Sequence, residues 1–131
     1  MAKAHGSFEQ LSWDEQTVEE FDDGAKLTHA AVTQKFSGDV EGDGAVQWLM
    51  SYGEDGSAHF VGLQRVTGTL GGRDGRFVLE VVGDFDGEVA TWRATVVPGS
   101  ATGGLAGLSG EATFSAPHGS TATFNLDYDL A

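Results

Sequence analysis

The chain has 131 residues, with 20 glycines, two prolines and no cysteine, and a formal charge of −13 from 7 basic and 20 acidic side chains. The absence of cysteine excludes a disulfide framework, a thiolate nucleophile and a zinc–cysteine site. The acidic balance argues against a nucleic-acid partner, because phosphate backbones need the opposite charge. Many glycines and few prolines are typical of short strands joined by tight turns, and we expect one domain over residues 1–131.

The N-terminal sequence MAKAHGSFEQ has no apolar run, so it does not resemble a signal peptide. No segment approaches the roughly 18 apolar residues that a membrane-spanning helix needs, so we expect no membrane partner. A cytoplasmic location is the default expectation.

Alternation of apolar and polar residues between turn signals predicts eight strands. Their expected bounds are His5–Leu11, Leu27–Ser37, Ala45–Tyr52, Ser57–Leu70, Gly75–Phe85, Glu88–Val97, Leu105–Ser115 and Thr121–Leu130.

The segment Trp13–Gly24 fits no strand pattern, and we expect a loop or one irregular helical turn. Much of the acidic charge gathers around it, at Glu9, Asp14, Glu15, Glu19, Glu20, Asp22 and Asp23. Two interpretations remain: a solvated segment that aids solubility, or a docking face for a basic partner.

The third strand leaves a choice of register. A four-residue loop over 53–56 would turn Gln47 and Leu49 inward, whereas a loop one residue longer or shorter would turn Val46, Trp48 and Met50 inward. We favour the second, because it places the Trp48 ring over Gly62. An outward Trp48 would instead suggest a subunit contact.

Turn chemistry predicts two nested hairpins between Arg65 and Val97. Asp86-Gly87 suits a two-residue turn, because both residues tolerate positive φ. Pairing about it sets Val81 opposite Trp92. Pairing about Gly72-Arg73 sets Arg65 opposite Glu80 and Phe60 opposite Phe85, an ion pair and an aromatic pair of the kinds that stabilise facing strands.

With the charges outside, one inner face emerges that is apolar except for Gln64. It comprises Phe60, Gly62, Gln64, Val66, Leu79, Val81, Gly83, Phe85, Ala90 and Trp92. The outer face then carries Val61 and Leu63 beside Arg65, an apolar pair compatible with a dimer or trimer. On the last strand, Ala122, Phe124, Leu126, Tyr128 and Leu130 share one face.

Eight consecutive antiparallel strands close most economically into an up-and-down barrel, which removes exposed edges. A sandwich is the alternative. A barrel of this size is either filled by its own side chains or holds one small ligand. Small residues beside large rings, such as Gly62, Gly83 and Ala90 near Trp92, favour a cavity.

The sequence contains no convincing metal or cofactor motif. Asp39, Glu41 and Asp43 resemble the start of a calcium loop, but the twelfth position falls on Met50, which cannot supply the required acid. The histidines His5, His29, His59 and His118 show no metal-ligand spacing. Phosphate-binding, dinucleotide-binding and nucleophile-elbow motifs are also missing, so we expect no cofactor.

Several segments together resemble one bacterial family, the domain of unknown function 3224 (DUF3224). They are GSFE from Gly6, KFSGDVEG from Lys35, RVTGTLGGRDGRFVLEVVGDF, VVPGSATGGLAGLSGEATF and the final LDYDL. The resemblance implies an allene-oxide-cyclase-like barrel, of a superfamily whose members bind apolar small molecules inside and guide ring closure.

The chain departs from this family at two inner positions. Members usually carry glutamate where Gln64 stands and histidine where Val81 stands, and the predicted register makes these positions direct neighbours. In relatives they could form a buried acid–base pair. Here neither side chain can titrate, so acid–base work at that position is lost.

These observations give two hypotheses that use the interior of the barrel, beside a third in which the interior is simply core and the function lies on the acidic surface. The first is a cofactor-free cyclase or isomerase acting on an apolar, polyketide-like or lipid-like molecule, with Gln64 and Tyr128 as candidate catalytic groups. The second is a module that binds a small hydrophobic ligand without chemistry. In both, the ligand contacts are expected from Trp48, Met50, Phe60, Val81, Phe85, Trp92, Phe124 and Leu126.

Overall fold

The computed structural model describes residues 2–117 and 121–130, and these residues form strands and turns without a helix. There is accordingly no helix among them that is long and apolar enough to cross a membrane. The strands are β1 (Ala2–Glu20), β2 (Lys26–Gly38), β3 (Val40–Tyr52), β4 (Ala58–Leu70), β5 (Arg73–Phe85), β6 (Val89–Val96), β7 (Thr102–Gly103), β8 (Leu108–Pro117) and β9 (Ala122–Leu130).

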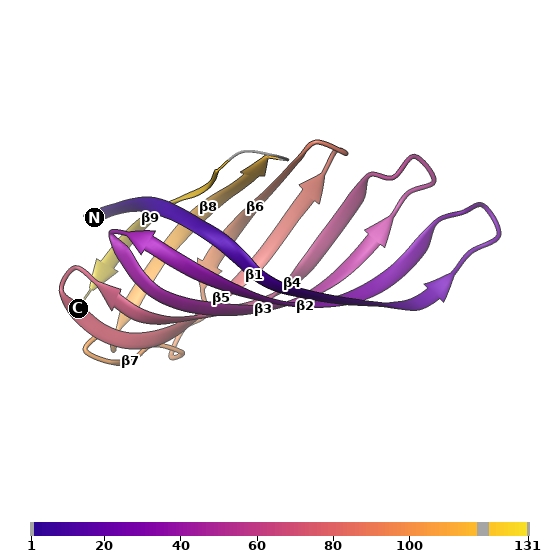
Figure 1. The fold of residues 1–131 in the computed structure, drawn as a ribbon. Helices are drawn as coiled ribbons and strands as arrows, with labels where there is room; N and C mark the ends of the chain where they lie inside the picture. Colours follow the sequence, from indigo (N-terminus) through magenta and orange to yellow (C-terminus); the bar gives the residue numbers. More distant parts are fainter. Residues whose placement is uncertain (1, 118–120, 131) are drawn as a thin grey trace.

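The eight long strands form a closed antiparallel barrel (Figure 1). Each strand pairs with the next along the chain, and β9 pairs with β1 to close the ring. The two-residue strand β7 lies outside this order and adds to the end of β5. The predicted up-and-down barrel is confirmed.

The barrel has two different ends, which we name by their solvent access. Hairpins β1–β2, β3–β4 and β5–β6 turn at the open end, and they fan outward (Figure 1). Both ends of the described chain lie at the opposite, closed end, with the β2–β3 and β4–β5 turns and the segment 97–107. Leu105 of that segment is buried, so the closed end is covered by the chain itself.

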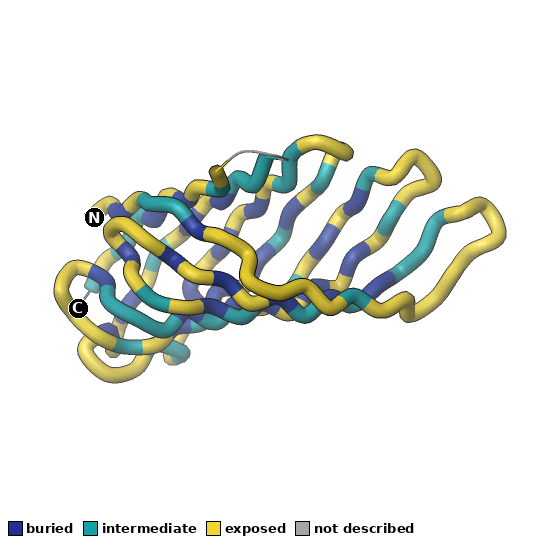
Figure 2. Tube along the Cα trace, viewed as in Figure 1, coloured by how far each residue is buried: buried dark blue, intermediate teal, exposed yellow. Residues whose placement is uncertain are grey.

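Burial alternates along the strands with a period of two, as the sequence pattern predicts (Figure 2). On β4, Phe60, Gln64 and Val66 are buried while Val61 and Leu63 are exposed. The predicted inward faces of the middle strands are therefore confirmed.

The predicted partners across the middle hairpins are wrong by two residues. Gln64 faces Leu79, Phe60 faces Gly83, and Trp92 faces Gly83 rather than Val81. The β4–β5 turn is centred on Gly71 and Gly72, both at positive φ, and not on Gly72-Arg73. A shift by two keeps every side chain on its face, which explains why the faces are right and the partners wrong.

The predicted two-residue turn after β5 is wrong for a different reason. Phe85 pairs with Ala90, so four residues lie between them instead of two. The Asp86 carboxylate accepts hydrogen bonds from the backbone N–H groups of Glu88 and Val89, at 2.9 and 2.8 Å. This side-chain cap stabilises a longer loop than the Asp-Gly pair suggests.

The predicted Arg65–Glu80 ion pair does not form. Glu80 faces Leu63, and Arg65 faces Val78. The Arg65 guanidinium instead donates to Thr67 Oγ1 at 2.6 Å and lies 3.4 Å from an Asp43 carboxylate oxygen, on β3.

The segment Trp13–Gly24 is not a loop or helical turn, because β1 continues through it to Glu20. Only Ala2–Phe8 pairs with β9. Beyond Phe8, β1 pairs with β2 and, within the described chain, with no other strand. Bulges between Gln10 and Ser12 and between Thr17 and Glu19 interrupt the alternation, which hides the strand from a periodicity search.

The choice of register for β3 is resolved in favour of an inward Trp48. The loop after Tyr52 has five residues, 53–57, and Trp48 lies opposite Gly62. A side chain at position 62 would collide with the carbonyl oxygen of Gln47. Glycine is thus needed here for close approach of the strands.

Candidate functional site

A cavity of about 810 Å³ opens at the open end of the barrel, and we call it the cup. Its volume lies in the range typical of small-molecule pockets. The residues that line it are Ser7, Phe8, Glu9, Gln10, Trp13, Lys35, Ser37, Trp48, Met50, Tyr52, Phe60, Phe85, Glu88, Ala90, Trp92, Ala116, Pro117, Thr121 and Ala122.

The cup exists because β1 separates from β9 partway along the barrel. Their pairing ends at Phe8 and Ala122, after which β1 follows β2 away from the barrel axis. On the β6–β8–β9 side, the lining residues Ala90, Ala116 and Ala122 are small. The separation of strands and these short side chains together leave the space empty.

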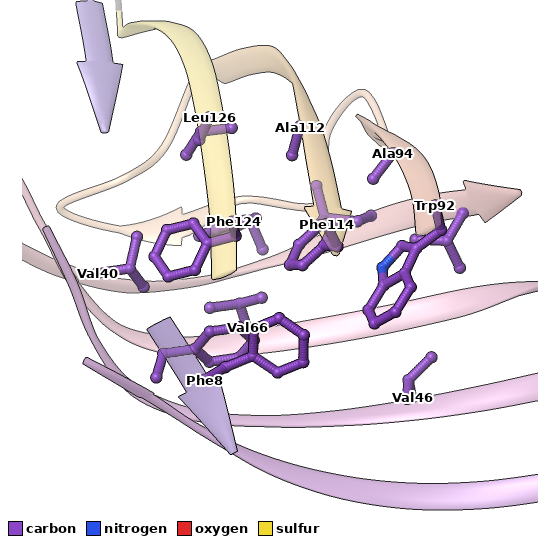
Figure 3. Packing of buried hydrophobic residues seen from close by; sticks show 14 of the residues in the cluster. Phe8, Val40, Val46, Val66, Trp92, Ala94, Ala112, Phe114, Phe124 and Leu126 are labelled. Atoms are coloured by element: carbon purple, nitrogen blue, oxygen red, sulfur yellow. The ribbon is translucent and has the colours of Figure 1, made fainter. Parts of the chain in front are cut away.

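Aromatic rings form the base of the cup. Trp92 packs edge-on against Trp48 at 5.3 Å and against Phe60 at 6.0 Å between ring centroids, and Trp48 meets Phe60 at 4.6 Å. Below them the rings continue into the core, where Trp92 stacks on Phe114 at 5.0 Å (Figure 3). Offset and edge-on contacts of this kind fix the rings relative to one another.

The half of the barrel near the closed end is filled. A void of only about 20 Å³ remains there, between residues such as Phe77, Leu79 and Leu126. That is room for about one water molecule. Among the described residues, the space for a guest molecule inside the barrel therefore lies at the open end.

Two buried amides lie beneath the base of the cup. Gln64 Nε2 donates to Gln34 Oε1 at 2.7 Å, and Trp92 Nε1 donates to Gln64 Oε1 at 3.4 Å. Both glutamines are fully buried, and the Gln34 Nε2 group has no partner. This chain of amides holds the indole of Trp92 in one orientation.

A second group of polar side chains lies on the wall formed by β1, β2 and β3. The Glu15 carboxylate accepts hydrogen bonds from Thr28 Oγ1 at 2.6 Å and Trp13 Nε1 at 2.9 Å. The Tyr52 hydroxyl, which contacts Met50 Sδ at 3.8 Å, lies close enough to Glu15 to affect its pKa. Tyr52 also lines the cup, so the group borders the cavity. A shallower groove continues from Tyr52 along this wall past Glu15 and Thr17.

The electrostatics of this group are set by its hydrogen bonds. Burial alone would raise the pKa of Glu15, but the donors Thr28, Tyr52 and Trp13, with the nearby charge of Lys26, lower it overall. Burial and the adjacent Glu15 carboxylate raise the pKa of Tyr52 to about 12. At neutral pH the pair is therefore an ionised carboxylate and a neutral phenol.

Comparison with known proteins gives the family. The family model described as "Protein of unknown function (DUF3224)" matches residues 4–128. The chain belongs to the DUF3224 family. A crystal structure of a DUF3224 protein of unknown function from Shewanella oneidensis MR-1 is similar over 100% of this chain and 98% of that one, with 27% sequence identity and a TM-score of 0.78. No curated protein matches the sequence.

The sequence-predicted ligand contacts divide between the cup and the core of this DUF3224 barrel. Five of them line the cup: Trp48, Met50, Phe60, Phe85 and Trp92. Val81 is fully buried opposite Gly62, and Phe124 and Leu126 belong to the filled half.

The two predicted catalytic groups are not brought together. Gln64 lies beneath Trp92 and is not among the lining residues. Tyr128 lies at the closed end, where it pairs with Ala2 and its hydroxyl lies near Gly71 in the β4–β5 turn. The family positions 64 and 81 are diagonal neighbours, since Gln64 faces Leu79 and Val81 faces Gly62.

Sequence reasoning missed the contribution of β1. Phe8 and Trp13 line the cup, and Glu15 lies on its wall. Trp13, Glu15 and Thr17 all face β2 partners of the inner side, Val32, Ala30 and Thr28. Their spacing of two residues was the available signal, but the bulge on each side limits it to three positions.

The other predictions concern metal sites and the outer face. Within the described ranges, no three His, Asp or Glu side chains are placed to hold a metal ion; His118 lies outside those ranges. His59 points outward and lies 2.8 Å from Asp84. Val61 and Leu63 are exposed as expected, together with Leu49 of β3. Association of subunits through this patch stays a prediction.

Proposed function

We propose that the protein binds a small, largely apolar molecule in the cup. The observation that carries the proposal is the open cavity of about 810 Å³, which is floored by fixed aromatic rings while the rest of the barrel is filled. Apolar walls with a few placed polar groups are typical of sites that bind such ligands. Trp48, Phe60 and Trp92 would contact the flat or unsaturated part of the guest.

We further propose that the protein belongs to the allene-oxide-cyclase-like barrels. The closed up-and-down order of eight strands supports this, as does the glycine-rich segment 100–110 that leads into β8. In that case the cup would act as a cofactor-free cyclase or isomerase. Rings that hold one another at fixed angles could keep a flexible chain folded, which lowers the entropic barrier to ring closure without proton transfer.

Binding is tested with N-phenyl-1-naphthylamine, a neutral apolar probe whose fluorescence rises in apolar surroundings. We expect saturable binding to the wild-type protein and loss of binding in Ala90→Phe, which fills the cup. The control is Thr95→Phe on the same strand, because Thr95 is exposed on the outer face. Binding that survives Ala90→Phe unchanged would show that the probe lies elsewhere.

Catalysis is tested by incubating the protein with unsaturated polyketide-like and lipid-derived chains and separating the products by chromatography with mass spectrometry. An isomerase or cyclase of this kind converts the substrate to a product of equal mass and different retention. Bound substrate recovered unchanged would favour the non-catalytic binding module.

A further inference from the structure

The open end of the barrel is surrounded by acidic hairpin tips. Eight of the 20 acidic residues lie in three of these tips: Glu19, Glu20, Asp22 and Asp23 in β1–β2, Glu54 and Asp55 in β3–β4, and Asp86 and Glu88 in β5–β6. Lys26, which begins β2, is the basic residue of these three tips. At the closed end Lys3, Arg73 and Arg76 accompany Asp39, Asp74 and Asp129, so the excess of acidic charge is largest at the open end.

The same sign of charge reaches into the cavity. Glu9 and Glu88 line the cup, with Lys35 as the basic residue among its lining side chains. Glu15 and Glu54 line the groove that continues from Tyr52, together with Lys26. Carboxylates thus outnumber ammonium groups in both places, and a cleft with low-dielectric walls and an excess of one sign of charge concentrates ions of opposite sign.

The side chains of this wall already show how a cation is accommodated. Lys26 places its ammonium 5.2 Å from the centre of the Tyr52 ring, in cation–π geometry. Trp48, Phe60 and Trp92 offer further aromatic surface at the base of the cup. Aromatic surface combined with carboxylates is the chemistry that recognises organic ammonium groups.

We propose that the ligand of the cup is a cation: an amine or quaternary ammonium group attached to a flat or extended apolar body. The apolar body lies on the rings at the base, and the ammonium group lies toward Glu15, Tyr52 and Glu88 at the wall and mouth. This inference depends on the proposed binding function and specifies the class of ligand. It does not depend on whether the bound molecule reacts.

The test compares three probes with one apolar body and different charge: 1-pyrenemethylamine, 1-pyrenemethanol and 1-pyreneacetate. Energy transfer to pyrene from the three tryptophans, all of which line the cup, reports binding. At low ionic strength we expect the amine to bind roughly tenfold more tightly than the alcohol and the carboxylate more weakly still. High salt should narrow these differences, because screening weakens long-range attraction.

Matched variants test which carboxylates produce the preference for the amine. Glu15→Gln and Glu88→Gln should each weaken binding of the amine several-fold and leave the alcohol almost unchanged. Glu111→Gln, exposed on the outer face of β8, should leave both unchanged. Circular dichroism and thermal melting establish that each variant is folded.

The outcomes separate the two proposals. Equal binding of the amine and the alcohol, or tighter binding of the carboxylate, would overturn the cationic ligand while supporting an apolar site. Failure of all three probes to bind would overturn both the cationic ligand and the proposed binding function.

Discussion

Trp92 connects the cup to the core. Its ring contacts Phe8, Trp48, Phe60 and Phe114 at centroid distances between 5.0 and 6.0 Å. Its indole N–H has one acceptor, Gln64, which in turn donates to Gln34. Gln64, which the sequence suggested as a candidate catalytic group, therefore positions an aromatic ring at the base of the cup.

We expect Gln64→Leu to destabilise the fold by about 2 kcal/mol, because it leaves the Trp92 indole and the Gln34 amide buried without partners. Urea denaturation measures the free energy of unfolding. The double variant Gln34→Leu/Gln64→Leu should recover part of this loss, since it removes both amides together. A double variant that loses the sum of both single effects would contradict the coupling.

The ionisation of Glu15 and Tyr52 makes the stability of the cup wall depend on pH. The pKa of Glu15 is lowered by its donors, so its contribution to stability is present above its ordinary value of 4.5 and is lost as the pH falls through the lowered value. The pKa of Tyr52 is raised from 10.0 to about 12, so its contribution is present below pH 10.0 and is lost as the pH rises toward 12.

The ultraviolet absorbance of tyrosinate tests this coupling. In a Tyr128→Phe background, Tyr52 is the one tyrosine left, and it should ionise near pH 12. Adding Glu15→Gln should move its pKa back toward 10, because the adjacent carboxylate charge is removed. Glu54→Gln, on the neighbouring exposed loop, should not move it. A titration unchanged by Glu15→Gln would show that burial alone raises the pKa.

At the scale of elements, the sequence predicted six of the eight long strands with both ends within three residues of those observed, because each alternates without interruption. The strand β3 begins at Val40, five residues before the predicted start at Ala45. On β9 the alternation runs from Ala122 to Leu130. Partners across hairpins were less predictable. They depend on loop lengths, and those are set by details such as the Asp86 cap, which leaves no trace in the hydrophobic pattern.

The strand β1 shows the limit of periodicity most clearly. Its second half has Leu11, Trp13 and Val18 exposed, and acidic residues between them. It is a strand because β2 offers a long partner, not because of its own pattern. Edge strands commonly carry charges and bulges, which prevent unwanted pairing and also hide them in the sequence.

We predict that the two halves of β1 differ in stability. Amides of Gly6–Phe8 lie between β2 and β9, whereas those of 9–20 have β2 on one side only. Amide hydrogen exchange followed by NMR should be faster in the second half, on the order of tenfold or more. The matched reference is Leu27–Phe36 of β2, which lies between two strands. Equal protection along β1 would indicate a further partner for its free edge.

At the scale of the whole molecule, the barrel joins a filled half to an empty one. The sequence indicated small residues beside large rings; of these Ala90 lines the cup, whereas Trp92 and Phe60 fill the space beside Gly83. The sequence could not place the cavity at one end of the barrel. The cavity forms where β1 separates from β9 after Phe8, and that point depends on pairing between strands at opposite ends of the chain. For the same reason, the contacts predicted from Phe124, Leu126 and Tyr128 lie on the correct inner face but outside the cup.

The same substitution in the two halves should have opposite consequences. Ala116 lines the cup, so Ala116→Leu should fit without loss of stability and should block binding of N-phenyl-1-naphthylamine. Ala112 lies on the same strand in the filled half, beside a void of about 20 Å³. Ala112→Leu should overpack that region and cost about 1–3 kcal/mol.

Thermal melting and probe titration of both variants test whether the barrel is packed at its closed end and empty at its open end. A barrel that is hollow throughout would tolerate Ala112→Leu as well as Ala116→Leu. A barrel whose open end collapses in solution would be destabilised by Ala116→Leu instead, and the wild-type protein would not bind the probe. Stability lost at position 112 and binding lost at position 116 is the one combination that requires a packed closed end beneath an empty cup.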